Sequence, residues 1–234
     1  MTTLLRTDWL LVSRQDPKTR AFVRVGTLGF DGRHYTFVYE DGAARPLPGL
    51  PLGRIHSSDT LFPIFAERVM DPHRPEKAAM MEHLGLAAEA GPFEVLAVSG
   101  GGRTGDTYEL TPLPQPGAVS LPFLVHGVRY LTDHERASID RLQPGDQLSL
   151  RHEPGNPANA RALLVTQGGE KLGYVPDPLL EYVHDIMTTH YELTVERVNP
   201  PAAGLHMRLL VRLKGQYSGE PEGRPSRQGI GSTR

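Results

Sequence analysis

The chain is built mostly of short apolar runs that turn-forming residues interrupt. The runs AFVRVGTLGF (21–30) and HYTFVYE (34–40) flank an Asp-Gly turn, and this pattern predicts a β-hairpin. Similar runs predict strands at 123–130, 147–152, 161–166 and 171–175, and a closing hairpin over 191–198 and 205–214. The segment 93–113 combines two apolar runs with a Gly-rich centre, which predicts one more hairpin.

Helical spacing of apolar residues is confined to a few segments. It predicts helices over 60–70, 75–90 and 176–190, and a short helix or turn over 134–146. In the segment 176–190 one apolar stripe is formed by Leu179, Leu180, Val183, Ile186 and Met187. The predicted fold class is therefore α+β, mainly β.

These elements fall into two small domains. The segment LPQPG at 113–117 has the composition of a linker. It separates a β-rich domain with two helices (1–115) from a second domain (119–214). Residues 215–234 are rich in Gly, Pro and Ser, so we expect a disordered tail there.

Composition narrows the classes of function. The 234 residues include no Cys, which excludes disulfides and thiolate chemistry. No apolar stretch approaches the roughly 20 residues of a membrane-spanning helix, and the N-terminus lacks a signal-peptide pattern. We therefore expect a soluble, cytoplasmic protein. Because the formal net charge is −2, nucleic acid is expected to bind only at a small local patch rather than at a broad basic face.

The most specific pattern lies between Phe123 and Pro176. It reads FLVHGVRY (123–130), then LSLRHEPGNPANARALLV (148–165) with a Pro/Asn-rich turn, then KLGYVP (171–176). Over about residues 119–190 this order resembles the HIRAN domain. The resemblance implies a small OB-like β-barrel with a flanking helix. It also implies a domain of DNA-repair and fork-remodelling proteins that grips single-stranded DNA at a free 3′ end.

A second resemblance covers about residues 25–71. A G-x-L strand, YTFVY, a Pro-rich loop and SDTLFPIFA follow one another there. This order is similar to the small N-terminal β-subdomain of HipA-type toxin kinases. It brings no kinase chemistry, but it implies a surface through which the N-terminal domain could dock another protein chain.

Seven side chains are candidates for contact with nucleic acid, and all of them are cationic, aromatic or amide groups. They are Arg129, Tyr130, Arg151, Asn156, Asn159, Arg161 and Tyr174. Arg129 and Tyr130 match the family's Arg-aromatic pair, in which a guanidinium can hold a phosphate while the ring stacks on a base. Asn159 stands where the family has Asp, and Ala158 where members that bind DNA ends carry an aromatic. The resemblance therefore implies a weaker hold on a 3′-hydroxyl.

Structural roles remain open for several of these residues. Alternation along a strand would bury one side chain of the Arg129–Tyr130 pair and leave the other solvated. Asn156 can simply hold the backbone of its own turn. Tyr174 can pack at the rim of a barrel.

Catalytic and metal-binding motifs are missing from the sequence, which has neither G-x-S-x-G nor H-E-x-x-H. We therefore expect no enzyme, no cofactor and no metal. The favoured hypothesis is a non-catalytic protein that binds single-stranded DNA or DNA 3′ ends in DNA repair or replication-fork processing. The alternative is a protein-interaction or regulatory module, related to toxin–antitoxin or defence systems, with a vestigial pocket.

Overall fold

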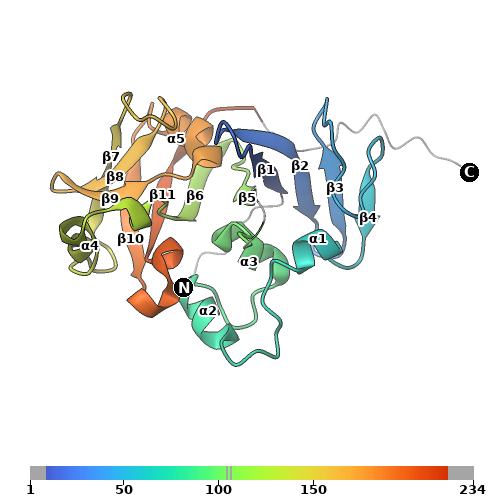
Figure 1. Cartoon of the computed structure of the whole chain (residues 1–234), viewed down its shortest axis with the longest axis horizontal. Helices are drawn as coiled ribbons and strands as arrows, with labels where there is room; N and C mark the ends of the chain where they lie inside the picture. The colour runs from blue at the N-terminus through green and yellow to red at the C-terminus, as the bar shows by residue number, and fades with distance from the viewer. Residues whose placement is uncertain (1–8, 104, 106, 221–234) are drawn as a thin grey trace, which may run out of the picture.

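Two antiparallel sheets, side by side, form the body of the protein (Figure 1). The computed structural model describes residues 9–103, 105 and 107–220. The first sheet has the strand order β4-β3-β2-β1-β5, and the second has the order β6-β11-β10-β7-β8-β9. Strands outweigh the few short helices, so the prediction of a mainly β chain is confirmed.

The first sheet and its helices form what we call the N-terminal unit. Its strands are β1 (Trp9–Gln15), β2 (Phe22–Phe30), β3 (Tyr35–Tyr39), β4 (His56–Ser58) and β5 (Tyr108–Pro112). Its helices are α1 (Pro63–Ala66), α2 (Lys77–His83) and α3 (Pro92–Ser99). The predicted hairpin is confirmed as β2–β3, which pairs Phe30 with Tyr35. The Asp31 carboxylate closes its turn by accepting bonds from the amides of Arg33 and His34.

The prediction of a hairpin over 93–113 is wrong in its first half. Residues 92–99 form α3, and only β5 is a strand. Pro92 occupies the first turn and Glu94 accepts a bond from the Gly91 amide, so the local signals favour a helix start. Gly100 ends the helix at φ 72°, in the left-handed region that suits glycine. Thr104 and Asp106, in the predicted Gly-rich tip, lie outside the described residues.

The second sheet forms the C-terminal unit together with two helices and four short 3₁₀ turns. Its strands are β6 (Gly117–Leu124), β7 (Gln147–His152), β8 (Leu163–Gln167), β9 (Glu170–Tyr174), β10 (Glu192–Val198) and β11 (Leu209–Tyr217). Its helices are α4 (Asp133–Ile139) and α5 (Leu180–Ile186). Its 3₁₀ turns are η1 (Val128–Tyr130), η2 (Asp177–Leu179), η3 (Pro201–Ala203) and η4 (Leu205–Met207). The predicted strands β7, β8 and β9 and the closing hairpin β10–β11 are confirmed.

Two boundaries in this unit differ from the prediction. The strand expected at 123–130 is β6, which ends at Leu124 before the chain turns at Gly127. The tail expected to be disordered from 215 begins inside β11, where Tyr217 still pairs with Gly117. Residues 221–234 of that tail lie outside the described residues. Pairing with the start of β6 accounts for the longer last strand.

Strands β6 and β9 are the edges of the second sheet, and they approach each other at one point. His126 and Tyr174 exchange two backbone hydrogen bonds of 2.9 Å in an isolated bridge. Within the described residues the sheet is otherwise open, so the expectation of an OB-like closed barrel is not confirmed. The bridge nevertheless brings the segment after β6 against β9.

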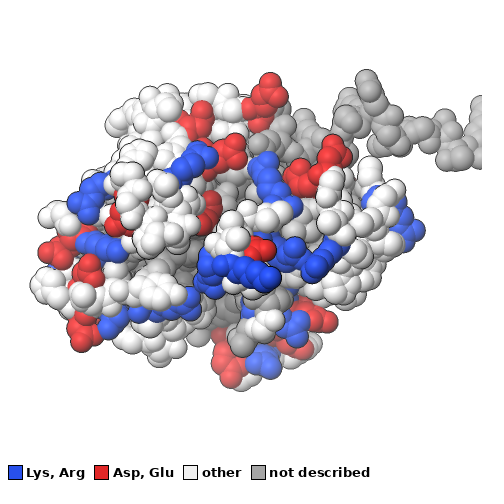
Figure 2. Space-filling model, turned by 45° about the horizontal axis from the view of Figure 1, so that its top comes forward, with Lys and Arg blue, Asp and Glu red and all other residues white. Residues whose placement is uncertain are grey.

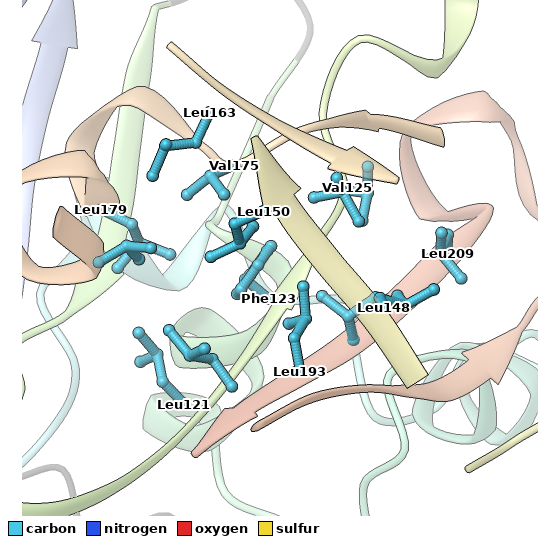
Figure 3. Packing of buried hydrophobic residues seen from close by; sticks show 14 of the residues in the cluster. Leu121, Phe123, Val125, Leu148, Leu150, Leu163, Val175, Leu179, Leu193 and Leu209 are labelled. Carbon is cyan, nitrogen blue, oxygen red and sulfur yellow. The ribbon is translucent and has the colours of Figure 1, made fainter. Parts of the chain in front are cut away.

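The main core lies inside the C-terminal unit, where Leu, Val and Phe side chains from both ends of the sheet converge (Figure 3). Leu11 of β1 and Leu113 of the connection β5–β6 belong to the same cluster. The expected linker at 113–117 is therefore anchored by a buried leucine, which is 1 % exposed. A smaller cluster also joins the two units, because Leu84 and Val98 pack with Leu210 of β11.

Candidate nucleic-acid interface

The turn η1 places Arg129 and Tyr130 on the surface. Gly127 has φ 76°, and the amide of Tyr130 donates to the Gly127 carbonyl at 2.9 Å. Val128 is buried at 2 % exposure and anchors the turn, whereas Tyr130 is 71 % exposed. Both predicted side chains therefore face solvent. The expectation that strand alternation would bury one of them is wrong, because they lie in a 3₁₀ turn.

Arg129 and Tyr130 form one compact group. The guanidinium carbon lies 4.6 Å from the centroid of the Tyr130 ring, within cation–π range. An Arg129 Nη2 hydrogen also bonds to the Tyr130 hydroxyl at 2.6 Å. The pair therefore presents a positive charge and an aromatic ring together, which are the two features that a phosphate and a base require.

Tyr174 joins this pair through close packing of the backbone. A Cβ atom at Gly127 would lie 2.9 Å from Cδ2 of Tyr174, so the tyrosine ring rests directly against the turn. Gly173 has φ 134°, and a Cβ atom there would lie 2.4 Å from the His126 carbonyl oxygen. Two glycines thus allow β9 to approach η1, and the structure brings Tyr174 next to the Arg129–Tyr130 turn.

A polar network extends from Tyr174 to the Pro/Asn-rich turn. The Tyr174 hydroxyl donates to Oε2 of Glu153 at 2.8 Å and accepts from Nζ of Lys171 at 2.7 Å. The side-chain amide nitrogen of Asn156 donates to the same Glu153 oxygen at 2.7 Å. This bond from Asn156 is the main cause that lowers the pKa of Glu153, and Tyr174 and the charges of Lys171 and Arg151 act in the same direction.

The two asparagine side chains in the turn after β7 form hydrogen bonds to the backbone of that turn. The side-chain oxygen of Asn156 accepts bonds from the amides of Ala158 and Asn159 at 2.9 and 3.2 Å. Asn159 does the same for the amide of Arg161 at 2.9 Å. Both residues therefore hold their own backbone, and this geometry matches the structural alternative for Asn156.

The predicted residues form two groups. Arg129, Tyr130 and Tyr174 lie together at η1 and β9, and Asn156 is linked to Tyr174 through Glu153. Arg151 is exposed on β7, and its charge helps to lower the pKa of Glu153. Asn159 and Arg161 instead line a pocket of about 240 Å³ between the two units. The turn from Glu153 to Arg161 therefore borders both places.

Sequence reasoning missed one member of the network and gave only weak signals for others. Lys171 is a single lysine in a short strand, and nothing in its neighbourhood marks it. Its Nζ atom lies 4.5 Å from the Tyr174 ring centroid. Gly127 and Gly173, which make the close approach possible, were the available signal, because a strand glycine often marks such a contact.

A partly buried carboxylate of the N-terminal unit lies behind this region. Oε1 of Glu109, on β5, is 3.7 Å from Nε2 of His126, and the Glu109 side chain is 16 % exposed. Burial raises the pKa of Glu109, and the nearby carboxylate of Asp177 adds to that effect, whereas His126 opposes it. This contact links the N-terminal unit to the residue that bridges to Tyr174.

The surface carries both signs of charge. Figure 2 shows Lys and Arg side chains interspersed with Asp and Glu over one face of the molecule. In the part of the chain that the structure describes, no group of three or more His, Asp or Glu side chains gathers as a metal site. None of the described helices is long and apolar enough to cross a membrane.

A comparison with known protein families agrees with the HIRAN resemblance. Residues 119–218 match the HIRAN domain family, which confirms the prediction and extends it through β10 and β11. A solved structure of a Lactobacillus plantarum protein is 25 % identical and covers 43 % of this chain and 96 % of its own, with a TM-score of 0.35. The crystal structure of the HIRAN domain of human HLTF is 23 % identical and covers 46 % and 84 %, with a TM-score of 0.31. A search of curated proteins gave no match.

Proposed function

From the premise that residues 119–218 form a HIRAN domain, we propose that this protein binds single-stranded DNA without catalysing a reaction. The observation that carries the proposal is the exposed Arg129–Tyr130 pair, which is held on η1 against Tyr174. An exposed tyrosine with a guanidinium over its ring is a ready platform for one nucleotide.

Each part of the pair has its own role in this proposal. Arg129 holds a backbone phosphate, and the ring of Tyr130 stacks on the adjoining base. A stacked base contributes about 1–3 kcal/mol to binding. Lys171 lies behind Tyr174 and adds positive potential, but Glu153 offsets part of its charge.

The small number of cations sets the expected salt dependence. Each phosphate contact to a single strand contributes about −0.7 to the slope of log K against log salt. Contacts from Arg129 and Arg151 alone would therefore give a slope of about −1.4, far shallower than that of a protein with a broad basic face. A chain with a net charge of −2 fits such local binding.

The proposal also includes recognition of a DNA 3′ end and a role in DNA repair or replication-fork processing. Here Asn159 offers an amide oxygen in place of a carboxylate, and that oxygen already accepts the amide of Arg161. We therefore expect a free 3′-hydroxyl to be preferred only modestly over a blocked end.

Fluorescence anisotropy with a 5′-labelled hexanucleotide at low salt tests the proposal. We expect the wild-type protein to bind, the double variant Arg129→Ala/Tyr130→Ala to lose at least tenfold in affinity, and Arg141→Ala to bind normally. Arg141 is a matched control because it is an exposed arginine of the same unit, next to α4. A 3′-phosphorylated strand measures the end preference separately.

Failure of the wild-type protein to bind any single strand at low salt would refute the proposal. That outcome would favour the alternative function, a protein-interaction or regulatory module. The residues to test next would then be Leu52 and Ile55, which are 40 % and 48 % exposed in the Pro-rich loop of the HipA-like segment.

A further inference from the structure

The pocket between the two units is built from four separated segments. Leu11 comes from β1 and Phe22 from β2. Asn159 and Arg161 come from the turn after β7, and Pro178 comes from η2, the 3₁₀ turn that leads into α5. The pocket volume of about 240 Å³ lies just below the roughly 300–1,000 Å³ of sites that enclose whole small molecules. This size suits one nucleotide of a longer strand whose remainder lies outside.

The charged groups of the pocket are balanced. Arg24 and Arg161 carry positive charge, and Asp177 and Glu181 carry negative charge. Arg24 is held in place, because its Nη2 atom donates to the hydroxyl of Tyr182 at 2.5 Å across the two units. A nucleotide needs both signs, since its phosphate attracts guanidinium groups while its sugar hydroxyls and base N–H groups donate to carboxylates.

One apolar wall of the pocket is aromatic. Phe22 is half-buried at the start of β2, where its ring lines the pocket, while the next residue, Val23, is 52 % exposed. Neighbouring side chains on a strand point to opposite faces, so Val23 faces away from Phe22. A phenylalanine ring offers a stacking surface that accepts any base.

The turn after β7 connects this pocket to Tyr174, whose ring packs against η1 at Gly127. Asn156 contacts Glu153 in the network around Tyr174, and Asn159 lines the pocket three residues later. Three residues of extended chain span at most about 11 Å. Adjacent nucleotides of one strand can therefore meet the two ends of this turn.

We propose that the pocket between the units holds a second nucleotide of the strand that Arg129 and Tyr130 bind. Phe22 stacks on its base, Arg24 and Arg161 approach its phosphate, and the carboxylates of Asp177 and Glu181 face its donor groups. The inference rests on the proposed function and adds to it, because it makes the N-terminal unit part of the nucleic-acid site.

The variant Phe22→Leu tests the inference, since it keeps an apolar wall and removes the ring. We expect it to weaken binding of the hexanucleotide at least about fivefold, the equivalent of one lost stacking contact. Val23→Ala should bind as the wild type does. If Phe22→Leu binds normally while Arg129→Ala/Tyr130→Ala loses binding, the second nucleotide does not enter the pocket, although the proposed function stands.

Photo-crosslinking to the wild-type protein gives a test that is independent of any folding defect. Trypsin cleaves after Arg20 and Arg24 and releases the peptide 21–24, which contains Phe22. A hexanucleotide with 4-thiothymidine at each position in turn should crosslink this peptide from one position and the Tyr130 peptide from the neighbouring one. Crosslinks to the Tyr130 peptide alone overturn the inference, and crosslinks to neither remove the proposed function as well.

Discussion

Replacement of Gly173 by alanine probes the contact on which the candidate site depends. Gly173 has φ 134°, which costs an L-residue about 1–2 kcal/mol. A Cβ atom there would also lie 2.4 Å from the His126 carbonyl oxygen and 2.5 Å from Cγ1 of Val125. Relief of that clash requires β9 to move away and break the two backbone bonds between His126 and Tyr174, each worth about 0.5–1.5 kcal/mol. The expected loss of stability is about 2–5 kcal/mol.

Gly169→Ala is the matched control for this experiment. Gly169 lies in the turn between β8 and β9 with φ 92°, but no atom lies within 4 Å of the position of its added Cβ. It therefore reports the backbone cost without the clash. Urea unfolding followed by circular dichroism should show a midpoint for Gly173→Ala that is lower than that of Gly169→Ala by about 0.5 M, with similar slopes. Equal midpoints would refute the close approach of β9 to residue 126.

Three further outcomes follow from single side chains. Glu109→Gln should raise the melting temperature at pH 7 but not near pH 4, because a raised carboxyl pKa costs stability only as the pH rises above the ordinary value of 4.5. Thermal scans at both pH values measure this, and an equal shift at both would contradict it. Glu153→Gln should lower the melting temperature at pH 7 and lose that effect as the pH falls well below 4.5, because the lowered pKa of Glu153 stabilises the fold only while the group is ionised. Thr132→Ala should cost about 1 kcal/mol, a fall of about 2–4 °C by calorimetry, because the Thr132 hydroxyl accepts the Glu135 amide at the start of α4. An unchanged melting temperature would show that this cap does not stabilise the fold.

Elements with a clear alternation or a specific turn could be predicted from the sequence. The Asp-Gly turn identified β2–β3, and the order of strands around the Pro/Asn-rich turn identified the C-terminal unit. The helix α3 could not be recognised from its apolar pattern, because Phe93, Val95, Leu96 and Val98 are all buried and leave no polar face. The signals that favour a helix here are Pro92 in its first turn and Glu94, which caps its N-terminus.

The sequence indicates which kinds of side chain belong to the candidate site, but not how they are arranged in space. Arg129 and Tyr130 were placed on a strand, because the apolar run continues to residue 130 and outweighs the single break at Gly127. Asn159 and Arg161 were placed with them, but they face a pocket whose other wall is β1 and β2. Contacts between segments more than 100 residues apart leave no local pattern, so Phe22 and Arg24 could not be associated with this region.

The leucines that cross between the units make the HIRAN domain an unsuitable fragment to study in isolation. Leu11 and Leu113 fill space inside its interior, so a clone that starts at residue 119 would leave a cavity and expose apolar surface. We expect such a truncation to aggregate, and a protease cut near residue 115 to leave both halves associated. A foreign sequence in place of the N-terminal unit would have to supply apolar side chains where Leu11 and Leu113 lie, because the core of the C-terminal unit packs around them.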